Sequence, residues 1–406
     1  MNNKLIPELR FPEFLNDGDW TEKRISDIGE TINGLSGKSG EDFGVGKPYV
    51  TYKQVFDNSI IDFEKCGKVQ ISENEKQNVL QKGDILFTTS SETPNEVGFA
   101  SILASSPIEK TYLNSFCFSL RPFSLEETRP EFARYLFHSP TYRNGITTLA
   151  QGSTRYNISK VAFLKLKIPI PNPQEQQKIA SCLSSLDEVI TGYNQKLELL
   201  KVHKKGLMQN LFPQDGEKFP KYRFPAFEND GEWVKKTLGE VCEMQAGKFV
   251  SASEINTQFS NDLYPCYGGN GLRGYTKSYT HTGTYSLIGR QGALCGNVTL
   301  ADSRFHATEH AVVVTPGKSI DTVWLFYVLE LLNLNQYATG QAQPGLSVSN
   351  LERVKLSVPL SFNEQQKIAS CLSTCDELIA GQTAKIEQLK QHKKGLMQGL
   401  FPKMND

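Results

Sequence analysis

The sequence predicts an α+β protein in which two mixed α/β domains are joined by two long antiparallel helices, with an internal repeat about a pseudo-twofold axis. The stretch EQQKIASCL occurs at 175–183 and again, letter for letter, at 364–372. Each copy leads into HKKGLMQ at the same offset of 189 residues, and similar blocks at 7–20 and 220–233 open each half. The inserts between these blocks have little identity, so we expect a symmetric scaffold that carries two different domains.

Each EQQKIASCL block begins a long helix. Prolines precede the block, and Pro213 or Pro402 follows the helix, because proline is tolerated only ahead of a helix or in its first turn. Apolar residues recur at alternating steps of four and three, apart from Lys204 in the first copy and Gln382 and the matching Lys393 in the second. This is the heptad pattern of a coiled coil.

A helix over 174–211 would be about 57 Å long, which is too long for one globular domain to bury. The other copy in the same chain is the simplest partner, so we expect an intramolecular antiparallel coiled coil in a dumbbell-shaped molecule. The first helix would carry the chain away from the first insert, and the second would return it. Gly192 and Gly381 in mid-helix each cost about 1 kcal/mol relative to alanine, which packing along the heptad positions must offset.

The two inserts show the same order of elements: strands, a helix, a polar loop and an apolar strand that enters the long helix. We infer one shared α/β fold with different loops. The expected strands are 49–56 and 83–91 in the first insert and 283–293 and 310–316 in the second, and the expected helices are 129–146 and 322–334.

The chain length of 406 residues leaves room for about two to four domains. The repeated blocks divide it into a first domain, a first helix, a second domain and a second helix, at 1–168, 169–213, 214–358 and 359–406.

Composition limits the class of protein. Lys plus Arg and Asp plus Glu number 44 each, so no net field draws the chain to nucleic acid or membrane. The zero net charge argues against a protein that binds DNA non-specifically on its own. It does not argue against a sequence-specific DNA-binding subunit whose partner makes most of the phosphate contacts. Without an 18-residue apolar stretch or a secretory leader, we expect a cytoplasmic protein with no membrane contact. The eight cysteines show neither CxxC nor metal-ligand spacing, so we expect reduced thiols and no metal site.

Two apparent nucleotide-binding motifs lack the context that such sites need. The GKS triplet at 37–39 resembles the end of a phosphate-binding loop, but Ile32 stands where that motif requires glycine. The GxGxxG pattern at 269–274 is not followed by an apolar helix. Methyltransferase, helicase and nuclease signatures are also absent from the sequence. We therefore expect no catalysis by this chain alone.

The second insert holds a segment typical of nucleic-acid contact, YPCYGGNGLRGYTKSY at 264–279. Glycine lets the backbone approach a ligand closely, arginine pairs bidentately with guanine and asparagine with adenine, and lysine or tyrosine can hold phosphates. IGRQGA, at the end of a strand, adds a second group; the alternative interpretation is a surface turn cluster. The candidate DNA contacts are Tyr267, Asn270, Arg273, Tyr275, Lys277, Arg290 and Gln291.

The first insert has corresponding polar segments around the strand at 49–56, directly after GDILF, and in the loop QGSTRYNIS at 151–159. The second insert has TGQAQPGLSVS at 339–349 in the place of that loop. Matched positions with changed side chains are expected of two readers of different sequences, and also of two idle loops. The candidate DNA contacts are Lys47, Tyr49, Lys53, Thr88, Thr89, Ser90, Gln151, Arg155, Tyr156 and Asn157.

The repeated helices are also identical at positions that a heptad places in solvent. Packing explains identity at apolar positions but not at charged ones, so we expect equivalent docking patches for two copies of one partner. A recent duplication is the alternative, and the divergence of the inserts argues against it. The patches comprise Glu175, Gln176, Gln177, Lys178, His203, Lys204 and Lys205 in the first copy and Glu364, Gln365, Gln366, Lys367, His392, Lys393 and Lys394 in the second.

A duplicated EQQKIAxxL helix that ends in KKGLMQxLFP after each of two dissimilar inserts resembles the specificity subunits of type I restriction-modification enzymes. The resemblance covers essentially the whole chain, and YPCYGGNGLRGY and LIGRQGA look like phrases of that family's target-recognition domains. It implies that each of two such domains reads one half of a split site in double-stranded DNA, while the helices fix the length of the unread spacer.

The resemblance also implies partners. Two modification subunits, which bind S-adenosylmethionine and methylate adenine, would dock on the helices, and up to two restriction subunits would join for ATP-driven translocation and cleavage. S-adenosylmethionine, ATP and Mg are expected on those partners, and no cofactor is expected in this chain. Two other hypotheses remain: an adaptor with two carbohydrate- or peptide-binding domains on a coiled-coil spacer, and an enzyme, for which no catalytic constellation is found.

Overall fold

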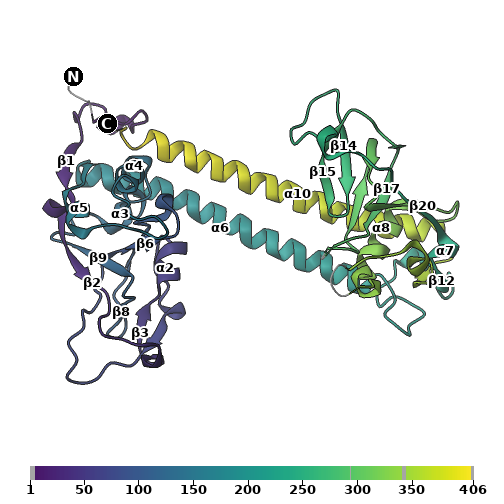
Figure 1. Cartoon of the computed structure of the whole chain (residues 1–406), viewed down its shortest axis with the longest axis horizontal. Helices are drawn as coiled ribbons and strands as arrows, with labels where there is room; N and C mark the ends of the chain where they lie inside the picture. The colour runs from purple at the N-terminus through teal and green to yellow at the C-terminus, as the bar shows by residue number, and fades with distance from the viewer. Residues whose placement is uncertain (1–4, 293, 341–343, 404–406) are drawn as a thin grey trace. The chain divides into compact units, whose positions relative to one another are not determined.

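The computed structural model describes residues 5–292, 294–340 and 344–403 (Figure 1). The chain forms two compact units: unit 1, with Met1–Tyr193 and Lys385–Asp406, and unit 2, with Asn194–Ala384. Each unit holds an α+β domain and part of each of two 38-residue helices, α6 (Pro173–Asn210) and α10 (Phe362–Gly399). The prediction of two α+β domains and two long helices is therefore confirmed.

The domain of unit 1 is built from short elements (Figure 1): β1 (Thr21–Arg24), α1 (Ile25–Ile28), β2 (Gly29–Asn33), β3 (Phe43–Val50), α2 (Tyr52–Asp57), β4 (Gly67–Val69), β5 (Ile85–Thr88), β6 (Ser90–Ser91), β7 (Ala100–Ile102), β8 (Tyr112–Leu113), β9 (Cys117–Pro122), α3 (Pro130–Leu136), α4 (Pro140–Thr147), β10 (Tyr156–Asn157), α5 (Lys160–Lys165) and β11 (Lys167–Ile170). One sheet has the order β2-β9-β5-β7 and another β4-β3-β8. Ile85 and Phe87 of β5 join one core and Leu86 another, as the period of two along a strand requires.

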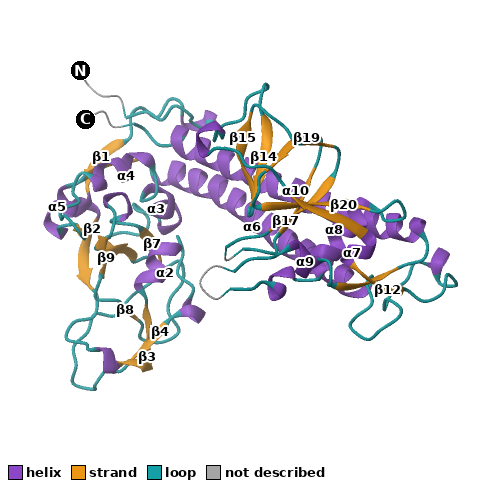
Figure 2. Cartoon of the chain, turned by 45° about the vertical axis from the view of Figure 1, so that its right-hand side comes forward, coloured by secondary structure: helices purple, strands orange, loops and turns teal. Residues whose placement is uncertain are grey.

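The domain of unit 2 contains β12 (Val234–Thr237), α7 (Leu238–Val241), β13 (Cys242–Ala246), β14 (Tyr264–Gly268), β15 (Gly271–Thr276), β16 (His281–Thr282), β17 (Tyr285–Gly289), β18 (Val298–Ala301), β19 (Arg304–Ala307), β20 (Ala311–Pro316), α8 (Thr322–Leu331), α9 (Val348–Leu351) and β21 (Lys355–Val358). Its sheets have the orders β13-β20-β17-β18 and β15-β14-β19-β16. Figure 2 shows α8 lying along the sheet that contains β17 and β20. Ile288 of β17 faces the core on the α8 side, and Leu287 faces the second core.

The two domains share one topology. In each, a four-stranded antiparallel sheet lies next to a sheet with one parallel pair, β3 with β8 in unit 1 and β14 with β19 in unit 2. In each, the first strand pairs with the last strand before the long helix, β1 with β11 and β12 with β21. The inference of a shared fold from the order of elements agrees with this arrangement.

Two expected elements of the first insert have different structures. The segment at 49–56 is not one strand, because Thr51 accepts a hydrogen bond from the Gln54 backbone N–H at 3.2 Å and caps α2. The helix expected over 129–146 is two helices, because Pro140 begins α4 and Ser139 caps it.

Within each unit the two long helices pack in opposite directions. In unit 1, Ile179 and Leu183 of α6 share a core with Leu396 and Leu400, which lie at and just after the end of α10. In unit 2 the roles are exchanged: Leu207 and Leu211, at the end of α6, share a core with Ile368 and Leu372 of α10. The apolar positions of the heptad pattern therefore bind both the other helix and the domain.

The opening blocks of the two halves repeat because they pack on the helix ends. Trp20 contacts Phe401 with ring centroids 6.0 Å apart, and Trp233 contacts Phe212 at 6.1 Å. The backbone N–H of Leu9 donates to Gly399 O at 2.8 Å, and the equivalent Tyr222 donates to Asn210 O at 2.9 Å. Each Leu-Phe-Pro that follows a long helix is thus bound by the opening block of one domain.

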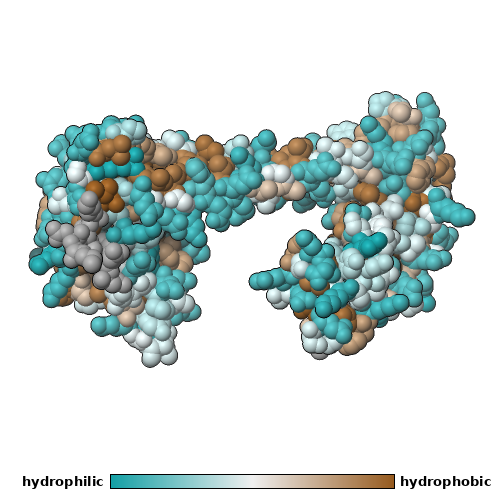
Figure 3. Space-filling view, turned by 90° about the horizontal axis from the view of Figure 1, so that it is seen from above, coloured by the Kyte–Doolittle hydropathy of each residue, from teal (hydrophilic) through white to brown (hydrophobic). Residues whose placement is uncertain are grey.

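On the face shown in Figure 3, hydrophilic residues cover most of the surface, and hydrophobic residues form only small patches. The eight cysteines are free thiols. Within the described part of the chain, no helix is both long and apolar enough to cross a membrane.

Candidate nucleic-acid interface

In unit 2, the glycine-rich segment at 264–279 contains a β-hairpin. β14 and β15 pair antiparallel, and Gly269 and Asn270 form the connecting turn. A Cβ at Gly289, the last residue of β17, would lie only 1.9 Å from Gly269 O. Glycine at this position therefore lets the hairpin turn approach the end of β17.

This approach creates a cavity of about 500 Å³ between the hairpin turn and the residues that follow β17. It contains three of the predicted DNA contacts: exposed Asn270 and Arg273 from the hairpin and exposed Gln291 from the segment after β17. These residue types have the donors and acceptors that read base edges. The cavity is lined by 268–273, Gln291, Gly292 and His310.

Arg290 is fixed beside this cavity by its backbone. Its N–H donates to His310 O at 3.0 Å, and its carbonyl accepts from the Leu346 N–H at 2.9 Å. Its Nε is buried and has no hydrogen-bond partner among the described residues. An orphaned guanidinium donor in a folded site is a candidate for pairing with an acceptor on a ligand.

The remaining predicted contacts of unit 2 differ from one another. Tyr267 packs edge-on against Phe305 at 5.8 Å, and burial raises the pKa of its hydroxyl. Tyr275 packs against Phe259 at 5.4 Å. The two tyrosines thus support the hairpin with their rings, whereas Lys277 is exposed.

In unit 1, two segments predicted separately lie side by side. β6 pairs with β10 through Ser90 with Asn157 and Ser91 with Tyr156. Gln151 and Asn157 exchange two backbone hydrogen bonds, of 2.9 and 2.8 Å. The polar loop after α4 is therefore joined to the segment that follows β5.

Some of the predicted contacts in unit 1 are structural. Thr88 is fully buried, and its Oγ1 accepts from the Phe99 N–H at 3.0 Å. Ser90 is buried too, and its carbonyl accepts from the Tyr52 hydroxyl at 2.6 Å. The expectation that Thr88 and Ser90 face a ligand is corrected, because β5 and β6 run into the core; Thr89 between them is half-buried.

Arg155 is the strongest exposed candidate of unit 1. Its guanidinium lies 5.2 Å from the ring of Phe116, which is 53% exposed. Exposed Arg155 and Phe116 offer a cation and an aromatic face together, the combination on which bases and phosphates are bound.

The other two predicted cationic contacts of unit 1 are in surface ion pairs. Lys47 contacts Glu109 at 3.2 Å, and Lys53 contacts Asp57 at 2.5 Å. Exposed pairs of this kind contribute little stability. Tyr49 is half-buried against Phe43, with ring centroids 5.1 Å apart, and supports β3.

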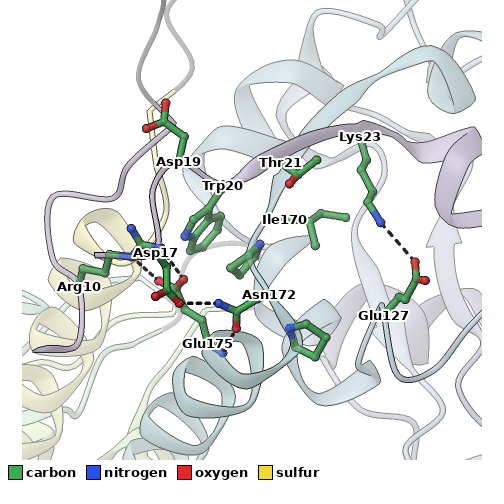
Figure 4. Close-up of a pocket in the computed structure, with 12 residues that line it drawn as sticks. Arg10, Asp17, Asp19, Trp20, Thr21, Lys23, Glu127, Ile170, Asn172 and Glu175 are labelled. Atoms are coloured by element: carbon green, nitrogen blue, oxygen red, sulfur yellow. Dashed lines mark hydrogen bonds and ion pairs between the residues drawn. The ribbon is translucent and has the colours of Figure 1, made fainter. Parts of the chain in front are cut away.

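Some of the repeated helix residues are buried within their own unit. Arg10 makes two hydrogen bonds of 2.8 Å to Glu175, and Arg223 makes two, of 2.8 and 2.7 Å, to Glu364 (Figure 4 shows the first pair). Glu175 is only 1% exposed, as is Glu364. Both expected docking residues are therefore corrected to buried partners of an arginine in the opening block.

The glutamine that follows each of these glutamates is also turned inward. Gln176 accepts from the Arg129 N–H at 3.0 Å and donates to Glu127 O at 2.8 Å. Gln365 likewise accepts from the Asp321 N–H at 2.8 Å and donates to Ser319 O at 3.1 Å. Each glutamine ties the start of a long helix to the segment before α3 or α8, which explains identity without a partner.

The other residues of the predicted patches lie at or near the surface, where Lys178 forms an ion pair with Glu13 at 2.8 Å and Gln177 accepts from Arg129 Nη1 at 3.1 Å. Lys204 and Lys393 form ion pairs within their own units, with Asp376 and Asp187. The exposed members of the predicted patches are Gln177, Lys178, His203 and Lys205 in the first copy and Gln366, Lys367, His392 and Lys394 in the second.

Comparison with known proteins identifies the family. The family model of the type I restriction modification DNA specificity domain matches 17–201 and 230–391 of this chain, one match for each half. The chain belongs to this family. Specificity subunits are the non-catalytic DNA-recognition components of type I systems, and the family that the repeated motifs predicted is confirmed.

Named relatives agree. The chain is 40% identical over 222 residues to the EcoprrI specificity subunit of Escherichia coli, a match that covers 53% of this chain and 54% of that protein. It is 26% identical over 404 residues to the putative MjaX specificity subunit of Methanocaldococcus jannaschii, covering 93% and 92% of the two chains. This chain thus spans about half the length of the first relative and nearly all of the second.

A solved structure shows the same fold. The type I restriction-modification S subunit of Mycoplasma genitalium aligns with a TM-score of 0.64 at 19% identity, covering 98% of this chain and 100% of that one. A chain from a study of complex assembly in a type I restriction-modification system aligns with a TM-score of 0.58 at 18% identity, covering 94% and 97%.

Three residues of the candidate interface were not predicted from the sequence. Phe116 beneath Arg155, Asn297, which donates to Asn270 Oδ1 at 3.2 Å, and His310 in the unit 2 cavity were not predicted. His310 stands at a polar turn between β19 and β20, and Asn297 precedes β18, so polar residues at strand ends were the available signal. The segment TGQAQPGLSVS lies partly outside the described residues, at 341–343.

Proposed function

We propose that the chain selects the DNA site of a type I restriction-modification complex, with each unit reading one half of a bipartite sequence. The observation that carries this proposal is one fold present twice with different polar residues at the same place. The segment after β5 or β17 meets the polar loop in both units, through Ser90 with Asn157 and through Gln291 with Gly345. Two domains that recognise different half-sites need the same backbone arrangement with different side chains toward the bases.

In unit 2 the proposed base contacts are Asn270, Arg273 and Gln291, with Arg290 beside them. A good bidentate pair provides about 1 to 3 kcal/mol of discrimination against the wrong base. In unit 1 we assign this role to Arg155, Tyr156, Asn157 and Gln151, with Thr89 at their edge. Lys47, Lys53 and Lys277 are assigned to phosphates, which position the duplex without reading it.

The two long helices would fix the spacer between the half-sites as an antiparallel coiled coil. Their outward faces would dock two modification subunits, which bind S-adenosylmethionine and methylate adenine, and up to two restriction subunits, which use ATP and Mg, would join the complex. The exposed repeated residues Gln177, Lys178, His203 and Lys205, with Gln366, Lys367 and His392, support equivalent docking surfaces. Lys394 does not belong to this surface, because it lines a cavity of unit 1.

The proposal is tested by mapping methylated sites in a host that carries this chain with its modification subunits. Arg273→Ala should relax or abolish one half of the methylated motif and leave the other half intact. Lys318→Ala is the matched control, because Lys318 is exposed in the same unit and has no ion pair among the described residues. An unchanged motif in the Arg273 variant would reject this residue as a reader.

The spacer is tested separately. Seven residues inserted after Asn194 and after the repeat-equivalent Thr383 keep the heptad register and lengthen both helices by about 10 Å, or roughly three base pairs. The methylated motif should gain that spacing. Insertion in one helix alone should break the seam and abolish methylation. An unaltered spacer in the double insertion would refute the role of the helices as a ruler.

A further inference from the structure

Unit 1 contains a second cavity of about 500 Å³, between α3, α4 and the last turns of α10. Five cationic side chains line it: Arg134, Arg143, Lys390, Lys393 and Lys394. Tyr135, Pro140 and Met397 give it apolar walls. Low-dielectric walls strengthen the field of the cations, so the cavity favours an anion.

The acidic groups around this cavity do not neutralise it. Asp187 serves two of the cations, Lys393 at 2.5 Å and Arg134 at 3.0 Å, and Glu387 pairs with Lys390 at 2.8 Å. Among the described residues, no carboxylate lies within ion-pair distance of Arg143 or Lys394. The lining therefore carries excess positive charge.

Arg143 is the most unusual of these groups. Its Nη2 donates to Asn95 O at 2.8 Å and its Nη1 to Gly98 O at 3.1 Å, while its guanidinium lies 4.5 Å from the ring of Phe99. Burial lowers its pKa from the ordinary value. A largely buried charge that has only carbonyl partners needs a counter-ion, because desolvation without pairing costs stability.

The excess charge belongs to unit 1 and not to the repeat. Tyr135 and Tyr327 occupy equivalent places, because their hydroxyls donate to Asp187 at 2.9 Å and to Asp376 at 2.7 Å. The residue before Tyr327 is Phe326, where unit 1 has Arg134. Three residues after Tyr327 stands Glu330, which contacts Lys204 at 3.5 Å. A docking surface shared by both repeats would not require this difference.

The cavity is also connected to the proposed DNA-reading segments of unit 1. Ser59, which lines it and accepts from Arg134 Nε at 2.7 Å, follows α2 with its exposed Lys53. The carbonyls of Asn95 and Gly98, which hold Arg143, follow β6 by a few residues. We propose that this cavity binds a backbone phosphate of the DNA next to the half-site read by unit 1, with Arg143 and Lys394 as its contacts. This inference rests on the proposed function.

The test uses the specificity subunit assembled with its modification subunits, with one duplex that carries the methylated motif and one of scrambled sequence. Equilibrium binding is measured by fluorescence anisotropy from about 0.05 to 0.3 M KCl. Lys394→Ala and Arg143→Gln should each weaken binding to both duplexes by roughly fivefold at 0.15 M salt and lower the salt slope by about 0.9, the signature of one lost phosphate contact. The methylated motif should not change.

Lys385→Ala is the matched control. Lys385 is exposed on the same helix, nine residues before Lys394 and so on the opposite face, and has no ion pair among the described residues. It should leave both affinity and salt slope unchanged. Because Arg143 also packs on Phe99, the exposed Lys394 keeps the test decisive if the Arg143 variant fails to fold.

Four results would contradict the assignment of this cavity to a DNA phosphate. Unchanged affinity and slope in Lys394→Ala, with normal binding by the unaltered complex, overturns the cavity assignment and leaves the proposed function standing. Loss of subunit assembly without a change in DNA affinity assigns the cavity to an acidic partner segment and also overturns it. Competition of inorganic phosphate for the cavity, seen in NMR shifts of the Arg143 side chain, without any effect of the variants on DNA would indicate a free phosphate. Failure of the unaltered complex to bind any duplex would reject the proposed function itself, and the cavity assignment with it.

Discussion

Lys393 Nζ lies 2.5 Å from Asp187 Oδ1 in unit 1, and its repeat-equivalent Lys204 lies 2.7 Å from Asp376 Oδ1 in unit 2. In each unit the same carboxylate accepts a hydrogen bond from a tyrosine of the domain. The two lysines occupy matching positions at which both helices lack an apolar residue of the heptad pattern. The gap in the pattern therefore marks a polar link that joins one helix, the other helix and the domain.

The first prediction concerns this link. Asp187→Asn should leave Lys393 and Arg134 without their counter-charge and lower the local opening free energy of 173–193 by about 1 to 3 kcal/mol. Hydrogen–deuterium exchange of that segment measures the loss. Asp376→Asn should have the same effect in unit 2 and leave unit 1 unchanged. Equal exchange rates with and without Asp187 would show that the link contributes no stability.

The second prediction is that acid destabilises unit 1 through His138. Burial lowers the pKa of His138 from 6.5 to about 4, and its Nε2 donates to Ala100 O at 2.7 Å. The unfolded chain binds this proton first as pH falls. The unfolding free energy of unit 1 should therefore decrease between pH 6.5 and about 4, by at most about 3 kcal/mol.

Glu330 occupies the equivalent position in unit 2, and it should make unit 2 less stable as pH rises, the opposite of the effect of His138 in unit 1. Burial raises its pKa above the ordinary 4.5, so its contribution is present at low pH and is lost as pH rises through the folded pKa. Fluorine-labelled tryptophan separates the units, because Trp20 reports unit 1 and Trp233 reports unit 2 during urea unfolding. His138→Gln should make the unfolding free energy of unit 1 less dependent on pH between 6.5 and about 4. The same pH dependence in that variant and in the unaltered chain would show that His138 is not its source.

The third prediction concerns the mid-helix glycines. A Cβ at Gly192 or Gly381 meets no heavy atom within 4 Å outside its own helix backbone and chain neighbours, and both residues are exposed. Alanine at each position should raise the free energy of unfolding by about 0.5 to 1 kcal/mol, because glycine loses more backbone entropy in a helix. Urea unfolding measures the gain, and a loss in either variant would indicate that the helix must bend there.

The two long helices and the blocks that pack on their ends could be predicted from the sequence, because repeated segments and heptad periodicity mark them. The opening and closing blocks recur where Trp20 meets Phe401 and Trp233 meets Phe212. Heptad spacing gave the long helices, and Lys204 appeared as a gap in it. A repeated residue type does not show whether its side chain faces the solvent or the interior. Glu175 is charged and belongs to a repeated motif, yet it is buried in an ion pair with Arg10.

The candidate interface was predictable in part, for a different reason. Residue type alone pointed to Asn270, Arg273 and Gln291, and the structure brings these three to one cavity. The same reasoning failed for Thr88, whose hydroxyl is used by the Phe99 N–H within the core. A serine or threonine after an apolar strand can contact a ligand or accept a hydrogen bond from the backbone. The sequence is the same in both cases, and only the tertiary fold distinguishes them.

The fourth prediction tests the hairpin geometry directly. Gly289→Ala would place a Cβ 1.9 Å from Gly269 O, so the turn between β14 and β15 must move, at a cost of about 3 kcal/mol. The half-site read by unit 2 should disappear from the methylated motif, and exchange in the hairpin should accelerate. Ser286→Ala, three residues earlier on β17, is the control, since the buried Ser286 hydroxyl has no hydrogen-bond partner among the described residues. A motif that survives Gly289→Ala, with the hairpin still protected, would separate DNA reading from the close approach of these two glycines.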